Sequence, residues 1–170
     1  MPNARYDFGL ASSIEAEALG APGQRRFRLV IESDEGNANL WLEKTQLMQL
    51  SLVIGQMLTV PPSSARSDAQ SGQHDPSLHQ NRSPMDFDVG NINVGHDTEN
   101  DLFLIEVDNR GDDQHMGPFL RFSTSRAQLA YLSDQAQAVC EAGRPICELC
   151  HAPMNPDGHI CPKTNGHNLP

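Results

Sequence analysis

The hydrophobic positions of the chain form two similar runs, one on each side of a long polar segment. In the first run, short apolar stretches rich in β-favouring residues predict strands at 27–32 and 40–42. In the second run, the same pattern predicts strands at 103–106 and 119–122. After each pair of strands, apolar residues recur with three-four spacing, which predicts a helix. The apolar residues of the two helices are Leu47, Leu50, Ile54, Met57 and Leu58, then Leu129, Leu132, Ala136, Val139 and Cys140.

Local signals mark the ends of these helices. Ser125 and Gln128 have the spacing of a capping box at the start of the second helix. Gly143 followed by Pro145 is expected to end that helix, because neither residue continues a helix well. Thr45 is a suitable cap for the first helix. Each half of the chain therefore predicts one unit of strand, strand and helix.

Further strands are predicted at 6–8 and 85–94, where apolar and polar residues alternate. Gly90 and Gly95 indicate bends or bulges in the second of them. We therefore predict an α+β domain, in which an antiparallel sheet carries two helices on one face and is built from two strand-strand-helix units.

The polar segment at 59–84 is rich in Ser, Pro, Gln and Asp and has almost no large apolar residues. Such a stretch cannot bury enough surface to offset the entropy of ordering it, so we predict a flexible insertion. The α+β domain would then consist of 1–58 and 85–143, and 144–170 would form a separate tail.

The tail has the residues of a zinc site. Cys147 and Cys150 are separated by two residues, and a turn-forming stretch returns the chain to a second pair, His159 and Cys161. Zinc prefers four nitrogen or sulfur ligands in a tetrahedron. We predict that one Zn²⁺ is bound by these four residues, with His167 as the alternative to His159.

This zinc would have a structural role. The tail holds few large apolar residues, and metal binding supplies about 10–16 kcal/mol in small modules of this kind. Four protein ligands leave no open position for water, and no His-x-Glu sequence of the zinc deaminases is present, which speaks against a catalytic ion. The alternatives are a reduced tail without metal and a redox Cys-x-x-Cys pair. Cys140, at the end of the second helix, is interpreted as a core residue.

Composition bears on partners and location. The formal net charge is -10, so the chain repels phosphate backbones and nucleic-acid binding is not expected. No stretch has the 18 or more apolar residues of a membrane span, and the N-terminus has no secretory pattern. A cytoplasmic location is expected, where cysteines stay reduced and are available as metal ligands.

A second candidate chemistry involves polar residues outside the tail. His96, Asp97 and Asp101 lie close together beside a predicted strand, where they could move protons. The stretch 20–25, which ends at Arg25, reads as a turn whose amides could hold an anion. Together they suggest an enzyme that acts on a phosphorylated metabolite, provided that they meet in one cleft. Solvated loops and a plain turn give the same pattern.

The chain resembles a known bacterial family. The segments that carry the resemblance are 20–27, 42–47, 101–106, 125–128 and the tail ending Cys161-Pro-x-x-Asn165-Gly166. In this order they are similar to the domain-of-unknown-function family numbered 3090, best known from actinobacteria. The resemblance implies no activity, since none is established, but it implies the Cys-x-x-Cys…Gly-His-x-Cys-Pro zinc pattern. His151 departs from it, because the family has Gly there.

These observations lead to a functional hypothesis. We expect a non-catalytic binding or adaptor protein with a structural zinc ion, no catalytic residues and a protein partner. The alternatives are the enzyme described above and a nucleic-acid-binding regulator that uses the zinc tail. The regulator is disfavoured because Lys163 is the one fixed positive charge of the tail beyond Cys147.

Overall fold

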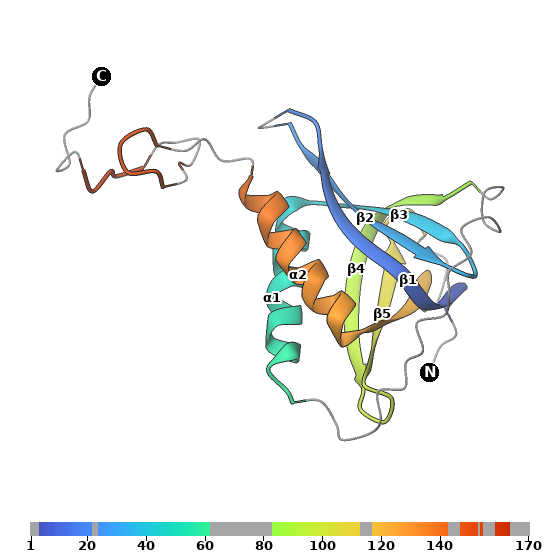
Figure 1. Ribbon diagram of the computed structural model, residues 1–170. Helices are drawn as coiled ribbons and strands as arrows, with labels where there is room; N and C mark the ends of the chain where they lie inside the picture. The colour runs from blue at the N-terminus through green and yellow to red at the C-terminus, as the bar shows by residue number, and fades with distance from the viewer. Residues whose placement is uncertain are drawn as a thin grey trace.

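The computed structural model describes residues 4–21, 24–61, 83–112, 117–142, 147–152, 154 and 159–163. In these residues, six strands close into a barrel, and two helices lie side by side against it (Figure 1). The elements are β1 (Tyr6–Leu19), β2 (Arg26–Ser33), β3 (Asn37–Leu42), α1 (Lys44–Leu58), β4 (Met85–Asp97), β5 (Leu102–Asn109), β6 (Leu120–Ser125) and α2 (Arg126–Glu141). The predicted α+β class with two helices on one side is confirmed.

The sheet differs from the predicted antiparallel one in two places. Neighbouring strands are antiparallel within each half of the chain, but β3 pairs with β4, and β1 with β6, in parallel. The parallel pair β3–β4 arises because α1 carries the chain back along the barrel between these two strands. Each half has three strands before its helix, because the further strands predicted at 6–8 and 85–94 join the two strand-strand-helix units as β1 and β4. β4 agrees closely with its predicted range, whereas β1 is much longer than predicted.

The two halves are arranged as a pseudosymmetric pair. Their helices meet at Ser51 and Ser133, which lie 82 residues apart in the chain. The Ser51 hydroxyl lies 3.3 Å from the carbonyl oxygen of Ser133. The Ser133 hydroxyl lies 3.2 Å from the carbonyl oxygen of Ser51. Both serines are buried, so these contacts satisfy hydroxyl groups in an otherwise apolar interface.

The core fills the barrel and the space under the helices. Alternate residues of β2, β3, β5 and β6 are buried, as a half-buried strand requires. The largest fully buried side chains are those of Phe103 and Phe122. Cys140 is 1% exposed and belongs to this core, as its helical spacing predicted.

The helix starts agree with the sequence in one case and correct it in the other. Ser125 caps α2 through a capping box with Gln128, as predicted. For α1 the cap is Glu43, whose backbone N–H donates to the Gln46 side chain, and the predicted cap Thr45 lies inside the helix. The predicted end of the second helix at Gly143 and Pro145 lies outside the described residues.

Of the predicted insertion at 59–84, residues 62–82 are outside the described part of the chain. On either side of them, α1 ends at Leu58 and β4 begins at Met85. Within the described residues, no helix has the length and apolar character needed to cross a membrane.

Gly55 offers a stability test in α1. A Cβ atom added there would meet no heavy atom within 4 Å. Gly55→Ala is therefore expected to raise the free energy of unfolding by about 0.5–1 kcal/mol, since alanine loses less backbone entropy in a helix. Urea denaturation measures the change. An unchanged or lower midpoint would contradict the helical conformation of this position.

Candidate metal centre

Four donor side chains meet in the C-terminal tail. The ligand atoms of Cys147, Cys150, His159 and Cys161 all lie within 4.8 Å of one another. The sulfurs of Cys147 and Cys161 are 3.9 Å apart, and the Cys150 sulfur lies 3.2 Å from Nε2 of His159. Zinc–sulfur bonds of about 2.3 Å in a tetrahedron place neighbouring donors about 3.8 Å apart. The spacing of these atoms therefore suits one tetrahedral ion.

A tight backbone turn positions the first two cysteines. The N–H of His151 donates to the Cys147 carbonyl at 2.9 Å, and the Cys147 N–H donates to the carbonyl of Ala152 at 2.9 Å. Inside the turn, the backbone N–H groups of Cys150 and Leu149 point at the Cys147 sulfur and lower the pKa of its thiol. A thiolate is the form that binds metal, so the turn prepares this sulfur for a cation.

Three histidines of the tail are candidates for the fourth donor, and they differ in where they lie. His159 stands in the cluster, whereas His151 is exposed and outside it. His167 lies beyond the described residues. The two buried cysteines of the tail, Cys147 and Cys161, do not belong to the barrel core. The cluster is thus a separate small centre that follows α2 in the chain.

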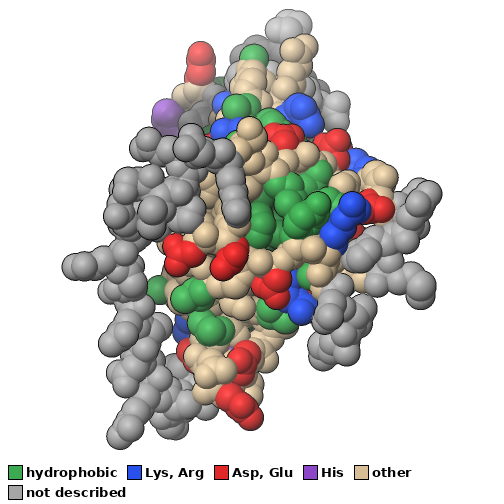
Figure 2. Space-filling model, turned by 90° about the vertical axis from the view of Figure 1, so that its right-hand side faces the viewer, with side chains coloured by type: hydrophobic (Ala, Val, Ile, Leu, Met, Phe, Trp, Pro, Cys, Tyr) green, Lys and Arg blue, Asp and Glu red, His purple; other side chains and the backbone are tan. Residues whose placement is uncertain are grey.

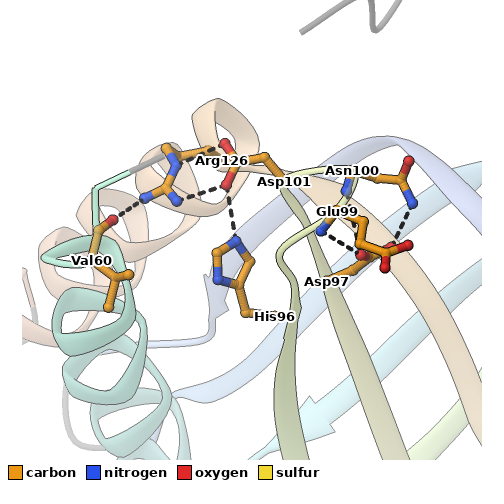
Figure 3. A network of polar contacts seen from close by, with 7 residues as sticks. All are labelled: Val60, His96, Asp97, Glu99, Asn100, Asp101 and Arg126. Atoms are coloured by element: carbon orange, nitrogen blue, oxygen red, sulfur yellow. Dashed lines mark hydrogen bonds and ion pairs between the residues drawn. The ribbon is translucent and has the colours of Figure 1, made fainter. Parts of the chain in front are cut away.

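A second polar cluster joins three elements at one end of the barrel (Figure 3). Asp101 accepts from Nη2 and Nε of Arg126 at 2.7 and 3.1 Å, and its Oδ1 lies 2.9 Å from Nε2 of His96. Arg126 also donates to the carbonyl of Val60 at 3.0 Å. The His96 ring stacks on Phe103 with centroids 4.4 Å apart. This cluster ties the β4–β5 turn to the start of α2 and the end of α1.

The residues of the suggested phosphate enzyme do not all meet. His96 and Asp101 are in contact, but Asp97 accepts hydrogen bonds from Asn100 and Glu99 within its own turn. Arg25 follows the turn between β1 and β2, which lies at the opposite end of the barrel from the β4–β5 turn (Figure 1). In that first turn the Gln24 N–H donates to the Ala21 carbonyl, as in a plain β-turn.

The match to a protein family covers the barrel, the two helices and the tail cluster. Residues 6–161 match the model of DUF3090, a family described as proteins of unknown function. The chain belongs to the DUF3090 family. The matched region of this DUF3090 protein includes both halves of the barrel and all four residues of the tail cluster. No curated protein and no solved structure matches the chain.

Sequence reasoning missed Arg126 as the centre of the second cluster in this DUF3090 protein. Its position did carry a signal. A cation in the first turn of a helix is opposed by the positive end of the helix dipole, so an arginine there calls for a carboxylate partner. Asp101 supplies that carboxylate and adopts a φ of 49°, a left-handed conformation that aspartate tolerates better than most residues.

The His151 backbone provides a test of the metal centre. His151 has a φ of 58°, in the left-handed region where glycine is favoured. Relieving a strain of about 1 kcal/mol by His151→Gly is expected to tighten zinc binding about fivefold. Competition with a chromophoric chelator measures this change. His151→Ala is the matched control, because it removes the imidazole without relieving the backbone, and an equal gain with alanine would contradict the explanation.

Asp101 makes stability depend on acid pH. The hydrogen bonds from Arg126, and next that with His96, lower the pKa of Asp101 from 3.8 to about 2. The charged form is favoured in the folded state, so its stabilisation is present above about pH 4 and is lost as the pH falls towards 2. The melting temperature of Asp101→Asn should lie below that of the wild type at pH 6, and the gap should narrow steadily as the pH falls from about 4 towards 2.

The side chain of Glu99 makes none of these contacts among the described residues, so Glu99→Gln controls for a general change in charge. Its melting temperature should follow that of the wild type over the same pH range. A constant gap between Asp101→Asn and the wild type at every pH would show that the Asp101 carboxylate does not act through its charge.

Proposed function

We propose that this protein is a non-catalytic binding or adaptor protein whose tail is held in shape by one structural Zn²⁺. The observation that carries the proposal is the closeness of Cys147, Cys150, His159 and Cys161. Three thiols and an imidazole are donors that suit zinc better than magnesium or calcium. Because all four tetrahedral positions would be filled by protein, the ion has no open position at which to activate water.

Energetics favour a structural role for this ion. The described tail residues bury Cys147 and Cys161, while Leu149 is 50% exposed and Ile160 is 89% exposed. Such a segment has almost no apolar core, so its fold needs another source of free energy. Zinc bound to a site of this kind supplies about 10–16 kcal/mol, which is enough to order a short tail.

A protein partner fits the surface better than the alternatives do. Hydrophobic side chains gather on the face shown in Figure 2, bordered by acidic and basic residues, which is typical of protein interaction surfaces. The enzyme alternative required Arg25 and the His96 cluster to meet, and they lie at opposite ends of the barrel. The net charge of -10 opposes binding to nucleic acid. Reduced thiols at the metal site are consistent with a cytoplasmic location.

Metal analysis of the native full-length protein tests the zinc proposal. We expect one zinc per chain, and a cobalt-substituted form with the visible spectrum of a tetrahedral sulfur-rich site. Adding azide should leave that spectrum unchanged, because no coordination position is open. Less than about half an equivalent of metal in native material would overturn the proposal of a zinc site. A spectral change with azide would overturn its structural character.

The adaptor role requires a separate test. Crosslinking in the native host should join the wild-type protein to a specific partner in a stable ratio. Retention of that partner by the zinc-deficient variant Cys161→Ser would place the contact on the barrel, and its loss would place the contact on the tail. Absence of any specific partner would contradict the adaptor role and leave the zinc proposal untouched.

A further inference from the structure

The two halves of the barrel each contain a long strand that outruns its parallel neighbour. β3 pairs with β4 only from Met85 to Asp88, whereas β4 continues to Asp97. In the other half, the pairing of β6 with β1 reaches Leu10, whereas β1 continues to Leu19. The second part of each long strand is therefore hydrogen-bonded to one neighbouring strand, and its other edge is left to the adjacent helix.

On β1, α2 covers this edge. Nε2 of Gln128 donates to the carbonyls of Ala11 and Ser12 at 3.1 and 3.0 Å. Two turns further along α2, Gln135 accepts the backbone N–H of Ala16 at 3.0 Å, and it is held by a 2.9 Å contact with Tyr131. Two side chains of α2, Gln128 and Gln135, thus form hydrogen bonds with the free backbone groups of β1.

On β4, α1 covers the corresponding edge at one position only. Nε2 of Gln46 donates to the carbonyls of Val89 and Gly90 at 3.3 and 2.8 Å, which matches the role of Gln128. The position on α1 that matches Gln135 is Val53, by the same separation that relates Ser51 to Ser133. Valine has no amide to offer. Among the described residues, no side chain hydrogen-bonds to the β4 backbone at 91–95.

This difference leaves a groove between α1 and β4. It has a volume of about 390 Å³. Its apolar lining comes from Leu50, Val53, Ile92 and Val94, and its polar lining includes Gln46, Gln49 and two asparagines of β4. Val53 lines this groove and is 43% exposed, whereas Gln135 fills the matching position between α2 and β1. An apolar floor beside an open strand edge is the arrangement that accepts an added strand.

We propose that this groove binds an extended basic peptide segment of a partner protein, which adds as a strand to the edge of β4 beyond Val89. The backbone of the segment pairs with the open edge, and alternate apolar side chains contact the floor formed by Leu50, Val53 and Ile92. The inference rests on the proposed binding role and gives it a location on the barrel.

Charge selects a basic segment. Near Gly90 the groove adjoins a second cavity of about 620 Å³, which is lined by Asp108 and Arg110 and by Glu106 and Asp112. Glu106 and Asp112 are ion-paired with Arg121 and Arg5, so Asp108 is the carboxylate of this lining that faces a bound cation. The other end of β4 carries Asp97, and the chain as a whole has a net charge of -10. Lysine or arginine in the bound segment would therefore be attracted by Asp108 at one end and by Asp97 at the other. A second copy of this chain fits less well, because it carries the same net charge of -10 and would be repelled.

The first measurement uses the free full-length protein. Amide hydrogen exchange followed by NMR should show the Val94 N–H exchanging at least about tenfold faster than the Ala16 N–H, because Gln135 covers only the latter. Val53→Gln places an amide side chain at the matching position of α1. This amide should accept the Val94 N–H and slow its exchange. Leu52→Gln is the matched control, since Leu52 is 58% exposed and does not line the groove.

The second measurement uses a random dodecapeptide library displayed on phage and selected on the full-length protein. Enriched peptides should alternate apolar residues and carry an excess of lysine and arginine. Synthetic copies should bind Val53→Gln at least about tenfold more weakly than the wild type and Leu52→Gln. Methylation of alternate backbone nitrogens in the peptide should abolish binding in one register, because it removes the donors that pair with β4.

The proposal is overturned if no peptides are enriched, if they bind Val53→Gln as tightly as the wild type, or if backbone methylation has no effect in either register. Protection of Val94 that rises with protein concentration in the absence of peptide would show that a second copy covers the edge, and would also overturn it. If these tests fail while crosslinking still yields a specific partner, the adaptor role stands and only its location on the barrel is wrong.

Discussion

Removal of zinc is expected to unfold the tail and leave the barrel folded. The buried cysteines of the tail lie outside the barrel core, so the two parts do not share a hydrophobic interior in the described residues. Loss of the ion removes about 10–16 kcal/mol from the tail, whose described residues have almost no apolar burial to replace it. Treatment with a chelator should therefore make the tail cleavable by protease, while the circular dichroism of the barrel and its melting transition change little.

Cys161→Ser should reproduce this result without a chelator. Cys140→Ala is the matched control, because Cys140 is a buried core residue outside the metal cluster and its replacement should leave one zinc per chain. Cooperative unfolding of the barrel on chelation would contradict the separation of the two parts. A tail that stays resistant to protease without metal would contradict the structural role of zinc.

Replacement of Phe103 by alanine is expected to lower the free energy of unfolding by about 3–5 kcal/mol. Phe103 is completely buried and is, with Phe122, one of the two largest fully buried side chains. Its ring also supports the polar cluster, since His96 stacks on it and the Arg126 guanidinium lies 5.2 Å from its centroid. The substitution thus leaves a cavity and removes the platform beneath two polar side chains. Urea denaturation measures the loss.

Leu52→Ala is the surface control for this experiment, because Leu52 is 58% exposed and its truncation should change stability by no more than about 0.5 kcal/mol. The second half of the test is coupling. Asp101→Asn should cost less in the Phe103→Ala background than in the wild type, because the cluster has already lost its support. Strict additivity, or a loss below about 1 kcal/mol for Phe103→Ala alone, would contradict this description of the core.

Much of this protein follows from local signals in its sequence. The helices were predicted because apolar spacing, the Ser125–Gln128 capping box and the surrounding residues all favour the same structure. The four tail donors were predicted because a Cys-x-x-Cys turn and a returning pair need few residues to come together, and the structure places them within 4.8 Å of one another. The repeat of the chain was also visible, since both halves place Gln and Leu at the start of a helix.

Tertiary structure alone decided how these units join. Pairing of β1 with β6 closes the barrel across more than a hundred residues of chain, and no local pattern specifies which distant edges meet. The length of β1 escaped prediction because it is rich in alanine and serine and changes phase at a bulge between Ala11 and Ser13. The contacts of Arg126 and the open edge of β4 likewise depend on neighbours from other elements. Periodicity and motifs determined the individual helices and strands and the tail donors, because they report interactions between residues close in sequence. Closure of the barrel, the polar cluster and the groove depend on packing between residues far apart in sequence.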